Sequence, residues 1–455
     1  MARQRMLVIG GDAAGMSAAS QARRMQGPEE LEIVAFERGP RTSYAACGLP
    51  YLVEGLVESP DRLISRTPEE FARRDIEVHV CHEVTGIDTG ARTVSVRHVS
   101  SGDERTEPWD ELVIGTGARG VRPPLPGIET DGVMQLRTIE DGVELDRRIA
   151  DGARNAVVVG AGYIGLEVAE ALSARGLSVT VVELLDSPMA GTLDGDMAEL
   201  VAAAVRDGGV DLQLGAGVEG FEPGADGSLS GVVVGGRALA ADVAVLGLGV
   251  QANAELAGAA GIPVGDAGGI VVDERMRTPV DGVWAAGDCV ESRHRITGES
   301  VVIALGTHAN KQGRVLGTNL GGGSATFPGV IGTAITKFGR TEIGRTGVTE
   351  EHARRLGIDV VASTARSKTR AGYYPGAEPV RVKLVTRCDD GVLVGAQVVG
   401  GEGAGKRIDT LATAIWCGMR VEDLATADLS YAPPMSPVWD PVVFAAGVAA
   451  RDLWR

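Results

Sequence analysis

The sequence predicts an α/β protein in which one strand–turn–helix–strand unit occurs twice and a smaller α+β region follows. Residues 6–38 and 155–184 each run from an apolar strand through a Gly-rich turn into an Ala-rich amphipathic helix and a second strand. Further along, the alternating segments 380–386 and 392–400 predict an antiparallel sheet, and residues 407–417 predict a helix packed against it. The repeated unit is the strongest of these observations, because two copies are much more informative than one.

Composition indicates an ordinary globular protein with an unusual need for glycine. The 455 residues are enough for two or three domains. Glycine occupies 65 positions, about twice the usual share of roughly 7%, without a collagen-like period. Many backbone positions must therefore form tight turns or approach a ligand closely. The formal net charge is −17, and because an acidic surface repels phosphate backbones, we expect no nucleic-acid partner.

Targeting signals, disulfides and metal sites find little support in the sequence. No run of about 18 uncharged apolar residues is present, so we expect no membrane span. The first apolar run is short and ends in Gly-Gly-Asp, which favours a strand over a signal peptide. The five cysteines are odd in number and form no C-x-x-C pair. We therefore expect a cytoplasmic protein, and the histidine spacing predicts no metal site.

The second Gly-rich turn is a complete G-x-G-x-x-G made by Gly160, Gly162 and Gly165. The first glycine forms the turn, the second lets the backbone approach a pyrophosphate, and the third allows close helix packing. Glu183 ends the next strand about 20 residues further on, where a carboxylate binds the ribose hydroxyls. Because no arginine follows Glu183 directly, and its carboxylate would repel a 2′-phosphate, NADH is favoured and NADPH remains possible.

The first Gly-rich turn departs from this pattern at one position. Gly10 and Gly15 hold the outer places, but Asp12 stands where the middle glycine is expected. The strand–turn–helix context and the second copy downstream still favour a dinucleotide site. Glu37, at the end of the next strand, would have the same ribose-binding role as Glu183.

Two further segments are typical of a flavoprotein. Residues 111–118 form a strand that ends in the small-residue turn Gly-Thr-Gly-Ala, which suits close approach of the backbone to a cofactor. Residues 278–290 run from a strand into Ala-Gly-Asp, where Asp288 can accept hydrogen bonds from polyol hydroxyls. The alternative for Asp288 is an ordinary helix N-cap.

Cys47 is the cysteine whose surroundings indicate chemistry. It lies where a helix is predicted to begin, with Pro50 in the first turn. Backbone N–H groups and the helix dipole at such a place favour the thiolate, which is the nucleophilic form. Cys81, Cys388 and Cys417 are interpreted as small packed hydrophobes, and packing also accounts for Cys289 beside Asp288.

The ordered motifs VIGGDAAG, SYAACGLPY, GTGA, GAGYIGLE and AAGD resemble those of the two-dinucleotide flavoprotein disulfide reductases. More narrowly, the segment from Ser43 to Cys47 is similar to the S-x-x-x-C branch, which has one redox cysteine instead of a pair. That branch contains coenzyme A-disulfide reductases, NADH oxidases, NADH peroxidases and NADH-dependent persulfide or polysulfide reductases. The resemblance covers essentially the whole chain and is greatest to coenzyme A-disulfide reductase.

The resemblance implies an α/β fold with two Rossmann-like dinucleotide-binding domains plus a C-terminal α+β dimerisation domain. The FAD-binding domain is expected over residues 1–122 and 250–325, the NAD-binding domain over 123–249, and the dimerisation domain over 326–455. A Pro-rich stretch and a Gly-rich stretch would serve as linkers between them.

The same resemblance implies that hydride passes from NADH to FAD and that electrons then reach Cys47 as the catalytic residue. Glu167 matches a glutamate that lies near the nicotinamide in relatives, although it could equally be an ordinary exposed helix residue. The residues expected to bind cofactor are Gly10, Ala14, Gly15, Glu37, Arg38, Ser43, Cys47, Thr116, Gly117, Gly160, Gly162, Ile164, Gly165, Glu183, Gly249, Gly287 and Asp288.

Ala13, three C-terminal tyrosines and Met435 bear on the acceptor and the assembly expected within the branch. Ala13 stands where oxidases and peroxidases usually have a histidine, which favours a coenzyme A-disulfide reductase. Tyr431 matches a tyrosine that reaches into the partner subunit's active site in relatives, so a homodimer is implied. Tyr373 is expected to be a second catalytic tyrosine, with Tyr374 as its alternative. Met435 replaces an aromatic residue that is frequent in relatives.

The predicted function is therefore NAD(P)H-dependent reduction of a low-molecular-weight disulfide, such as coenzyme A disulfide, through FAD and Cys47. The alternatives are an NADH oxidase, a persulfide or polysulfide reductase, and a biosynthetic reductase of a special metabolite on the same scaffold. A flavin electron-transfer partner of an iron–sulfur protein, which would need no thiol, is a further alternative.

Overall fold

A computed structural model of the chain describes residues 3–454. The described chain divides into two compact units, and each is treated by itself. Unit 1 contains the residues up to Leu52, Val57–Gly120 and Val250–Val330; unit 2 contains Val53–Leu56, Val121–Gly249 and the residues from Ile331 onward. The predicted α/β fold class is confirmed, whereas the predicted domain boundaries stay a prediction.

Unit 1 is built on a five-stranded parallel sheet in the order β18-β7-β1-β2-β3. Its strands are β1 (Gln4–Ile9), β2 (Leu31–Phe36), β3 (Glu77–His79), β7 (Glu111–Ile114) and β18 (Val283–Ala285). The apolar runs that predicted the first strands are therefore buried on both faces, as parallel strands require.

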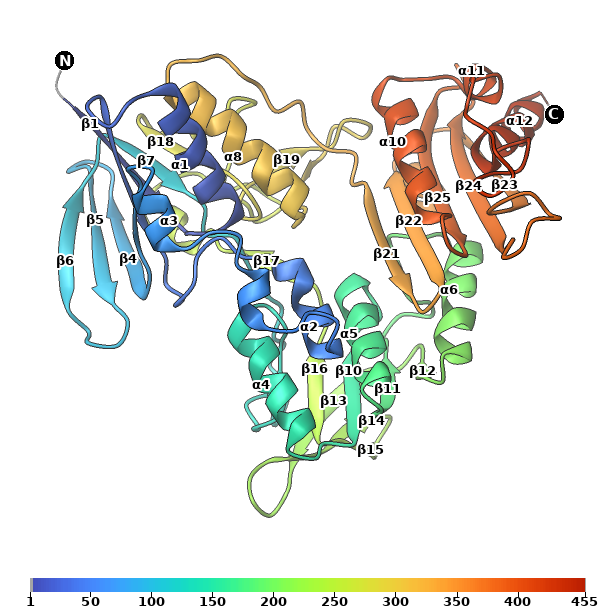
Figure 1. Ribbon diagram of the computed structural model, residues 1–455, viewed down its shortest axis with the longest axis horizontal. Helices are drawn as coiled ribbons and strands as arrows, with labels where there is room; N and C mark the ends of the chain where they lie inside the picture. Colours follow the sequence, from blue (N-terminus) through green and yellow to red (C-terminus); the bar gives the residue numbers. More distant parts are fainter. Residues whose placement is uncertain (1–2, 455) are drawn as a thin grey trace. The chain divides into compact units, whose positions relative to one another are not determined.

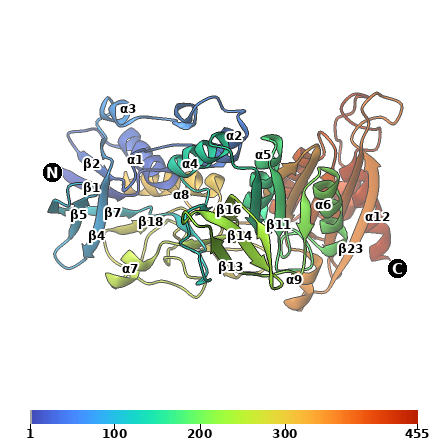
Figure 2. The same cartoon turned by 90° about the horizontal axis from the view of Figure 1, so that it is seen from below.

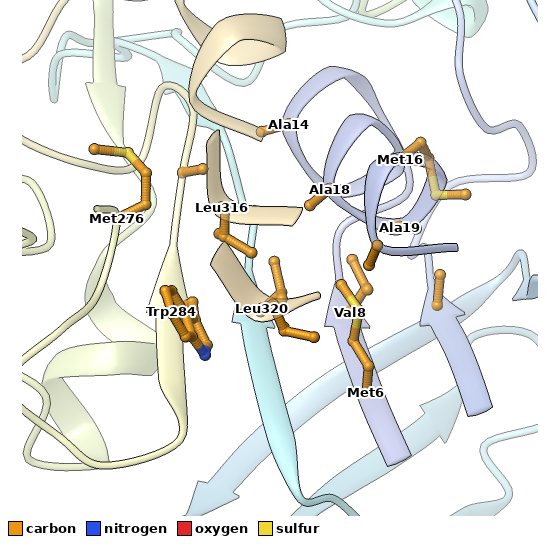
Figure 3. Close-up of a cluster of buried hydrophobic side chains, with 14 of the residues drawn as sticks. Met6, Val8, Ala14, Met16, Ala18, Ala19, Met276, Trp284, Leu316 and Leu320 are labelled. Atoms are coloured by element: carbon orange, nitrogen blue, oxygen red, sulfur yellow. The ribbon is translucent and has the colours of Figure 1, made fainter. Parts of the chain in front are cut away.

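Helices α1 (Ala13–Met25) and α8 (Gly306–Leu320) lie side by side against one face of this sheet (Figure 1). Met6 and Val8 of β1 point into a core shared with Ala18 of α1 and Leu316 of α8 (Figure 3). The alternate residues of the same strands fill a second core, which includes side chains of β4 (His82–Asp88), β5 (Thr93–His98) and α7 (Glu255–Ala259).

Glycines on α8 allow its close approach to α1. An ideal Cβ added to Gly313 would lie 2.3 Å from the Ala14 carbonyl oxygen, and one added to Gly317 would lie 2.4 Å from that of Ala18. A side chain at either position would push the helices apart. This packing fixes α1, whose N-terminus follows the first Gly-rich turn.

The remaining elements of unit 1 are short. They are η1 (Ala46–Gly48), α2 (Leu49–Glu54, whose end belongs to unit 2), η2 (Pro60–Leu63), α3 (Pro68–Ala72), β6 (Glu104–Pro108), β8 (Ala118–Gly120), β17 (Val250–Ala252), β19 (Ser292–Arg293) and β20 (Ser300–Val301). Strands β4, β5 and β6 form an antiparallel sheet, β17 pairs with β8, and β19 pairs with β20.

Unit 2 contains a second parallel sheet in the order β12-β11-β10-β16-β9. Its strands are β9 (Val133–Met134), β10 (Asn155–Val159), β11 (Ser178–Val182), β12 (Asp211–Gln213) and β16 (Val243–Leu246), and the accompanying helices are α4 (Ile139–Ala150), α5 (Tyr163–Ala174) and α6 (Gly195–Asp207). An antiparallel sheet of β13 (Val218–Pro223), β14 (Leu229–Val234) and β15 (Arg237–Ala240) packs nearby and shares a core with it.

The C-terminal part of unit 2 is the predicted antiparallel sheet, in the order β21-β22-β25-β24-β23. Its strands are β21 (Ala334–Phe338), β22 (Thr341–Gly347), β23 (Val360–Lys368), β24 (Pro379–Arg387) and β25 (Leu393–Gly400). Its other elements are α9 (Glu350–Arg355), η3 (Gly405–Arg407), α10 (Ile408–Trp416), α11 (Val421–Ala425) and α12 (Pro441–Leu453). The predicted helix is α10, which packs on β22 and β25, while α12 runs along β23 (Figures 1 and 2).

Buried charges join the two parts of unit 2. The Lys383 side chain is only 7% exposed, and its Nζ lies 2.8 Å from Asp196, 3.0 Å from Glu350 and 3.3 Å from Asp194. Gln397 of β25 also donates a hydrogen bond of 2.6 Å to Asp194, which precedes α6. Removing one partner of this network would leave a buried charge uncompensated, which would destabilise the contact between α6 and the C-terminal sheet.

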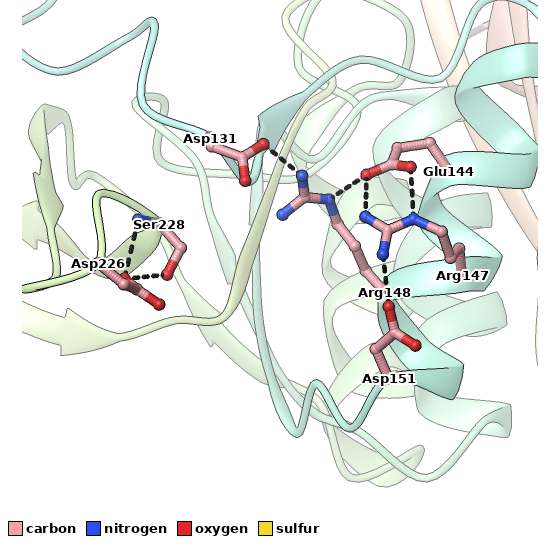
Figure 4. Close-up of polar contacts among 7 residues, drawn as sticks. All are labelled: Asp131, Glu144, Arg147, Arg148, Asp151, Asp226 and Ser228. Atoms are coloured by element: carbon pink, nitrogen blue, oxygen red, sulfur yellow. Dashed lines mark hydrogen bonds and ion pairs between the residues drawn. The ribbon is translucent and has the colours of Figure 1, made fainter.

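Several side chains of α4 form ion pairs, but these pairs do not explain the stability of the helix. Hydrogen bonds from the Arg147 guanidinium lower the pKa of Glu144 to about 2, and Arg148 bonds to the same carboxylate and to Asp131 (Figure 4). The pairs made by Arg147, whose side chain is 55% exposed, contribute little because solvent screens them. Across residues 3–454, no helix has both the length and the apolar character needed to cross a membrane.

Candidate functional site

The two Gly-rich turns adopt the same geometry. Gly10 has φ +101°, and an ideal Cβ on it would lie 2.1 Å from the Gly115 carbonyl oxygen. Gly160 has φ +103°, and its ideal Cβ would lie 2.6 Å from the Gly247 carbonyl oxygen. Both turns therefore require glycine for two reasons, the left-handed backbone and the close approach of a neighbouring strand end.

The third glycine of each turn brings the helix against the strand. An ideal Cβ on Gly15 would lie 2.1 Å from the carbonyl oxygen of Gly10, and one on Gly165 would lie 2.0 Å from that of Gly160. Neither α1 nor α5 has a side-chain cap at its N-terminus. The first-turn N–H groups can therefore face a pyrophosphate, as the sequence predicts.

The two acidic residues predicted to bind ribose lie at equivalent places. The Glu37 carboxylate accepts hydrogen bonds from the N–H groups of Gly11 (2.8 Å) and Gly39 (2.7 Å). The Glu183 carboxylate accepts them from Ala161 (2.7 Å) and Leu185 (2.9 Å). Each carboxylate is thus fixed at the end of the second strand, next to its Gly-rich turn.

Some of the other predicted FAD-binding residues are packed close to the first Gly-rich turn or the turn after β7, whereas Arg38 is exposed. Gly287, at φ +92°, approaches the start of α1 so closely that an ideal Cβ would lie 2.8 Å from the Ala14 Cβ, and Asp288 follows it. The Thr116 hydroxyl donates a hydrogen bond of 2.6 Å to the Asn253 carbonyl oxygen, which orders the turn after β7. Arg38, in contrast, has a side chain that is 72% exposed and lies 4.0 Å from Glu83.

The remaining predicted NAD-binding residues belong to unit 2. Ile164 lies in the first turn of α5, between Gly162 and Gly165. Gly249 has φ +83°, and its carbonyl oxygen accepts a hydrogen bond of 3.0 Å from the Val121 N–H. Each of the two Gly-rich turns therefore has the geometry that the predicted cofactors require.

Asp12 occupies the place of the missing glycine and is itself part of the site. Its Oδ1 accepts a hydrogen bond of 3.2 Å from the Tyr44 N–H. Burial raises the pKa of Asp12 to about 6, and the negative charges of Glu37 and Asp288 also raise it. Three carboxylates therefore interact at the turn that is expected to bind the FAD pyrophosphate.

Cys47 is exposed in the 3₁₀ turn η1, directly before α2. Pro50 lies in the first turn of α2, as predicted. Gly48 packs so tightly that an ideal Cβ would lie 2.3 Å from Leu63 Cδ2. Antiparallel hydrogen bonds, Ala45 N–H to the Leu63 oxygen (2.8 Å) and Ser65 N–H to the Ser43 oxygen (2.7 Å), hold the preceding loop.

The other cysteines are not alike in their surroundings. Cys289 is fully buried, and its thiol donates to the Ala286 carbonyl oxygen at 3.4 Å, which agrees with a packing role. Cys81 is half-buried, whereas Cys388 and Cys417 are exposed. The interpretation of these last two as packed hydrophobes is therefore wrong, because both lie at the surface of the C-terminal part of unit 2.

Two of the predicted catalytic residues, Tyr431 and Tyr373, lie together in unit 2. A hydrogen bond with the Tyr373 phenol raises the pKa of Tyr431. Both side chains are exposed, Tyr373 by 78% and Tyr431 by 47%. Arg407 fixes the two loops, because its Nη2 donates to the carbonyl oxygens of Thr369 (2.9 Å) and Met435 (3.1 Å).

Glu167 is not an ordinary exposed helix residue. It is half-buried on α5, and the Thr336 hydroxyl of β21 donates a hydrogen bond of 2.8 Å to its carboxylate. Burial raises the pKa of Glu167, and the nearby Glu170 also raises it. The side chain is thus fixed one turn into the helix that follows the second Gly-rich turn.

A cavity of about 380 Å³ in unit 1 contains residues that sequence reasoning missed. One face of α1 lines it together with α8 and the segment after Ile64. Its lining consists of Ala13, Met16, Ser17, Ser20, Arg24, Ser43, Ser65, Arg66, Phe71, Asn310 and Arg314. The three arginines are far apart in the sequence, so no local motif could have identified them.

No cluster of three or more His, Cys, Asp or Glu side chains suited to a metal ion occurs in the described part of the chain. The polar lining of the cavity consists of serines, one asparagine and three arginines. Guanidinium groups and hydroxyls are suited to bind anionic groups such as phosphates.

Comparison with protein families gives two matches that together span nearly the whole chain. Residues 4–313 match the family described as pyridine nucleotide-disulphide oxidoreductase. Residues 333–441 match the dimerisation domain of the same family.

Individual proteins give matches of similar extent. The chain is 38% identical to an NADH oxidase of Methanocaldococcus jannaschii, over 99% of both chains. It is 37% identical to an NAD(P)H coenzyme A polysulfide/persulfide reductase of Pyrococcus horikoshii, over 98% of both chains. Among solved structures, reduced CoADR-RHD of Bacillus anthracis is 34% identical with a TM-score of 0.95, covering 100% of this chain and 81% of that one.

The first and second glycines of the NAD-type turn are expected to have separable roles. Gly160→Ala should destabilise the fold by about 2–4 kcal/mol, because it combines a left-handed backbone with a clash. Gly162 has no atom within 4 Å of an ideal Cβ, so Gly162→Ala should cost about 1 kcal/mol or less. Gly162→Ala should instead weaken NADH binding about tenfold or more, because a methyl group blocks the pyrophosphate.

Urea unfolding and NADH titration of the two variants check this expectation. Equal losses of stability in both variants, or unchanged NADH affinity in Gly162→Ala, would contradict it.

Proposed function

The chain belongs to the pyridine nucleotide-disulphide oxidoreductase family, and within it we propose an NADH-dependent reductase of coenzyme A disulfide or a similar low-molecular-weight disulfide. It is an FAD-dependent enzyme that uses a nicotinamide cofactor. The observation that carries the proposed substrate is the arginine-lined cavity, which shares Ser43 with the loop that leads to Cys47. The resemblance of the S-x-x-x-C segment to coenzyme A-disulfide reductases supports the same substrate.

In this proposal each Gly-rich turn has its own cofactor. Gly10, Gly15 and Glu37 would hold the FAD pyrophosphate and ribose, with Asp288 near the polyol chain. Gly160, Gly165 and Glu183 would hold the corresponding parts of NADH. FAD, when bound, accepts hydride from the nicotinamide and supplies an electron pair to a nearby sulfur. The chain itself provides the anchoring groups and the position of that sulfur.

Cys47 would be the sulfur that exchanges with the substrate. Its thiolate attacks one sulfur of the disulfide, which forms a mixed disulfide and releases the other half as a thiol after protonation. Two electrons then break the mixed disulfide, release the second thiol and restore the Cys47 thiolate. Overall, NADH, one proton and one disulfide yield NAD⁺ and two thiols, so atoms and electrons balance.

The cavity provides positively charged groups that would bind the phosphates of coenzyme A. The protein carries a net charge of −17, yet Arg24, Arg66 and Arg314 line one hollow. Local positive charge in an acidic protein favours an anionic ligand, and guanidinium groups match phosphates well. The Arg66 guanidinium also lies 5.6 Å from the ring centroid of Phe71, and because the Phe71 side chain is buried, this contact helps to position the guanidinium in the cavity wall.

A second candidate acceptor is a persulfide or polysulfide of coenzyme A. A relative 37% identical over 98% of both chains is named an NAD(P)H coenzyme A polysulfide/persulfide reductase. Because this substrate would use the same phosphate-binding arginines, the cavity supports both candidates. The relative named an NADH oxidase is equally similar, so dioxygen must be included in any test.

NADH is the proposed electron donor in preference to NADPH. The Glu183 carboxylate, which is expected to bind the ribose hydroxyls, would repel a 2′-phosphate because like charges repel. The next two residues, Leu184 and Leu185, are 71% and 52% exposed and offer no positive charge.

The chain has the dimerisation domain of the family, and we propose a homodimer in which Tyr431 serves the partner's active site. Exposed apolar residues gather in the segment that follows Tyr431: Met435 is 73% exposed, Val438 69% and Trp439 66%. A second copy of the chain would cover such a surface. The family match supports this occupant, because it extends through residue 441.

A stopped-flow acceptor screen tests the proposed role of Cys47. The wild type should reduce coenzyme A disulfide faster than polysulfide, peroxide or dioxygen, and NADH should reduce the flavin faster than NADPH does. Cys47→Ser should slow disulfide reduction by about 100-fold or more while flavin reduction stays within about threefold. Cys417→Ser, which changes another exposed cysteine, is the control and should behave as wild type.

Unchanged acceptor reduction in Cys47→Ser would refute the thiol mechanism and favour direct electron transfer. Faster turnover with polysulfide or dioxygen than with coenzyme A disulfide would overturn the proposed substrate.

The cavity arginines should discriminate between disulfides with and without phosphates. Arg66→Gln and Arg314→Gln should each raise the KM for coenzyme A disulfide by about tenfold, since a charged hydrogen bond contributes about 1.5–3 kcal/mol. The KM for pantethine, which has the same thiol arm without the nucleotide, should change little. Arg62→Gln, outside the cavity lining, is the matched control. Equal effects on both disulfides would contradict a phosphate site.

Mixed dimers can show which subunit Tyr431 serves. A heterodimer of one Cys47→Ser chain and one Tyr431→Phe chain keeps one complete site only if Tyr431 acts across the interface. It should therefore retain about half of the wild-type disulfide reductase activity, whereas each homodimeric variant is strongly impaired. Activity no higher than that of the Tyr431→Phe homodimer would place the tyrosine in its own subunit's site.

A further inference from the structure

Asp12 places a carboxylate where the other turn has a glycine. Asp12 and Gly162 are both the N-cap residues of the helices that follow, α1 and α5. The backbone at both is extended, with ψ −153° at Asp12 and −171° at Gly162. The first turn therefore has an acidic residue, and the second a glycine, at the start of the helix that is expected to face a pyrophosphate. Two negative groups so close cannot both keep their charge without weakening the complex.

The carboxylate is tied into the site by the redox loop. Its Oδ1 accepts the hydrogen bond from the Tyr44 N–H at 3.2 Å. The two preceding residues are attached to the same turn: the Ser43 N–H donates to the Gly11 oxygen at 2.9 Å, and the Thr42 hydroxyl donates to that oxygen as well. Asp12 can turn away only by giving up its contact with the loop that carries Cys47.

The charged groups around Asp12 favour its neutral form. Glu37 faces it from the end of β2 and Asp288 from the segment after β18, and both are acidic. The Glu37 carboxylate also accepts hydrogen bonds from two backbone N–H groups, those of Gly11 and Gly39. A further negative charge beside Asp12 would raise the pKa of this carboxyl group again, so the group is readily protonated when a pyrophosphate binds next to it.

We propose that FAD binding is coupled to protonation of Asp12, so that the turn takes up one proton as the pyrophosphate enters. Once Asp12 is neutral, it no longer repels the pyrophosphate. The second turn avoids the same repulsion by having a glycine at this position. This inference rests on FAD binding at the first Gly-rich turn and is independent of which acceptor the enzyme reduces.

The affinity of the apoprotein for FAD as a function of pH tests this coupling. Flavin fluorescence quenching gives the Kd between about pH 5.5 and about pH 8.5, a range in which a carboxyl with a raised pKa titrates. Below the Asp12 pKa of about 6 the wild-type Kd should be constant. Above it, Kd should rise by up to about tenfold per pH unit, because binding then takes up a proton.

Asp12→Asn keeps the shape and the acceptor for the Tyr44 N–H but cannot titrate, so its Kd should not vary with pH. Glu111→Gln is the matched control. Burial also raises the pKa of Glu111, but this residue begins β7, whereas the turn follows the other end of β1, which runs parallel to it. Glu111→Gln should keep the wild-type pH dependence. A flat wild-type curve, or equal slopes in wild type and Asp12→Asn, would overturn the proposal.

Calorimetry gives an independent measurement on the wild type alone. Titration of apoprotein with FAD at about pH 7.5, in two buffers of different ionisation enthalpy, should reveal uptake of about one proton. Asp12→Asn should take up about none. Zero uptake by the wild type contradicts the coupling, whereas failure to bind FAD at any pH contradicts the proposed function itself.

Discussion

In each parallel sheet, two backbone segments approach closely at the carboxyl ends of neighbouring strands, and the rest of the molecule depends on this constraint. Gly10 meets Gly115 in unit 1, and Gly160 meets Gly247 in unit 2, at separations that leave no room for a side chain. This contact turns the chain sharply, so that the helix starts at the sheet edge with its N–H groups directed outward. The anionic cofactors of the family can then bind to these N–H groups without a cationic side chain.

The distribution of charge follows from that arrangement. Glu37 and Glu183, the residues proposed to bind ribose, are each held by two backbone donors. The arginines instead gather in a separate hollow along α1, where they would recognise the phosphates of a substrate. A protein with a net charge of −17 thus binds anions by local geometry, and its overall charge works against them.

The chemistry proposed for Cys47 depends on a loop that the first Gly-rich turn holds in place. Residues 42–44 bond to Gly11 and Asp12, and residues 43–45 pair with residues 63–65. Ser43 has φ +51°, an unfavourable value for a residue with a side chain, which the surrounding bonds maintain. Because the cofactor turn and the redox loop share these hydrogen bonds, a change in the charge of Asp12 would affect both segments.

The sequence by itself determined the fold class, both Gly-rich turns, their acidic partners and the likeness of Cys47 to a redox cysteine. These features are local, since a strand, a turn and a helix are written in consecutive residues. Only the tertiary structure assembled the cavity, because Arg24 of α1, Arg314 of α8 and Arg66 of the segment after Ile64 come together through packing. It also placed Cys388 and Cys417 at the surface. Contacts between distant segments depend on packing in three dimensions, and no spacing along the chain encodes them.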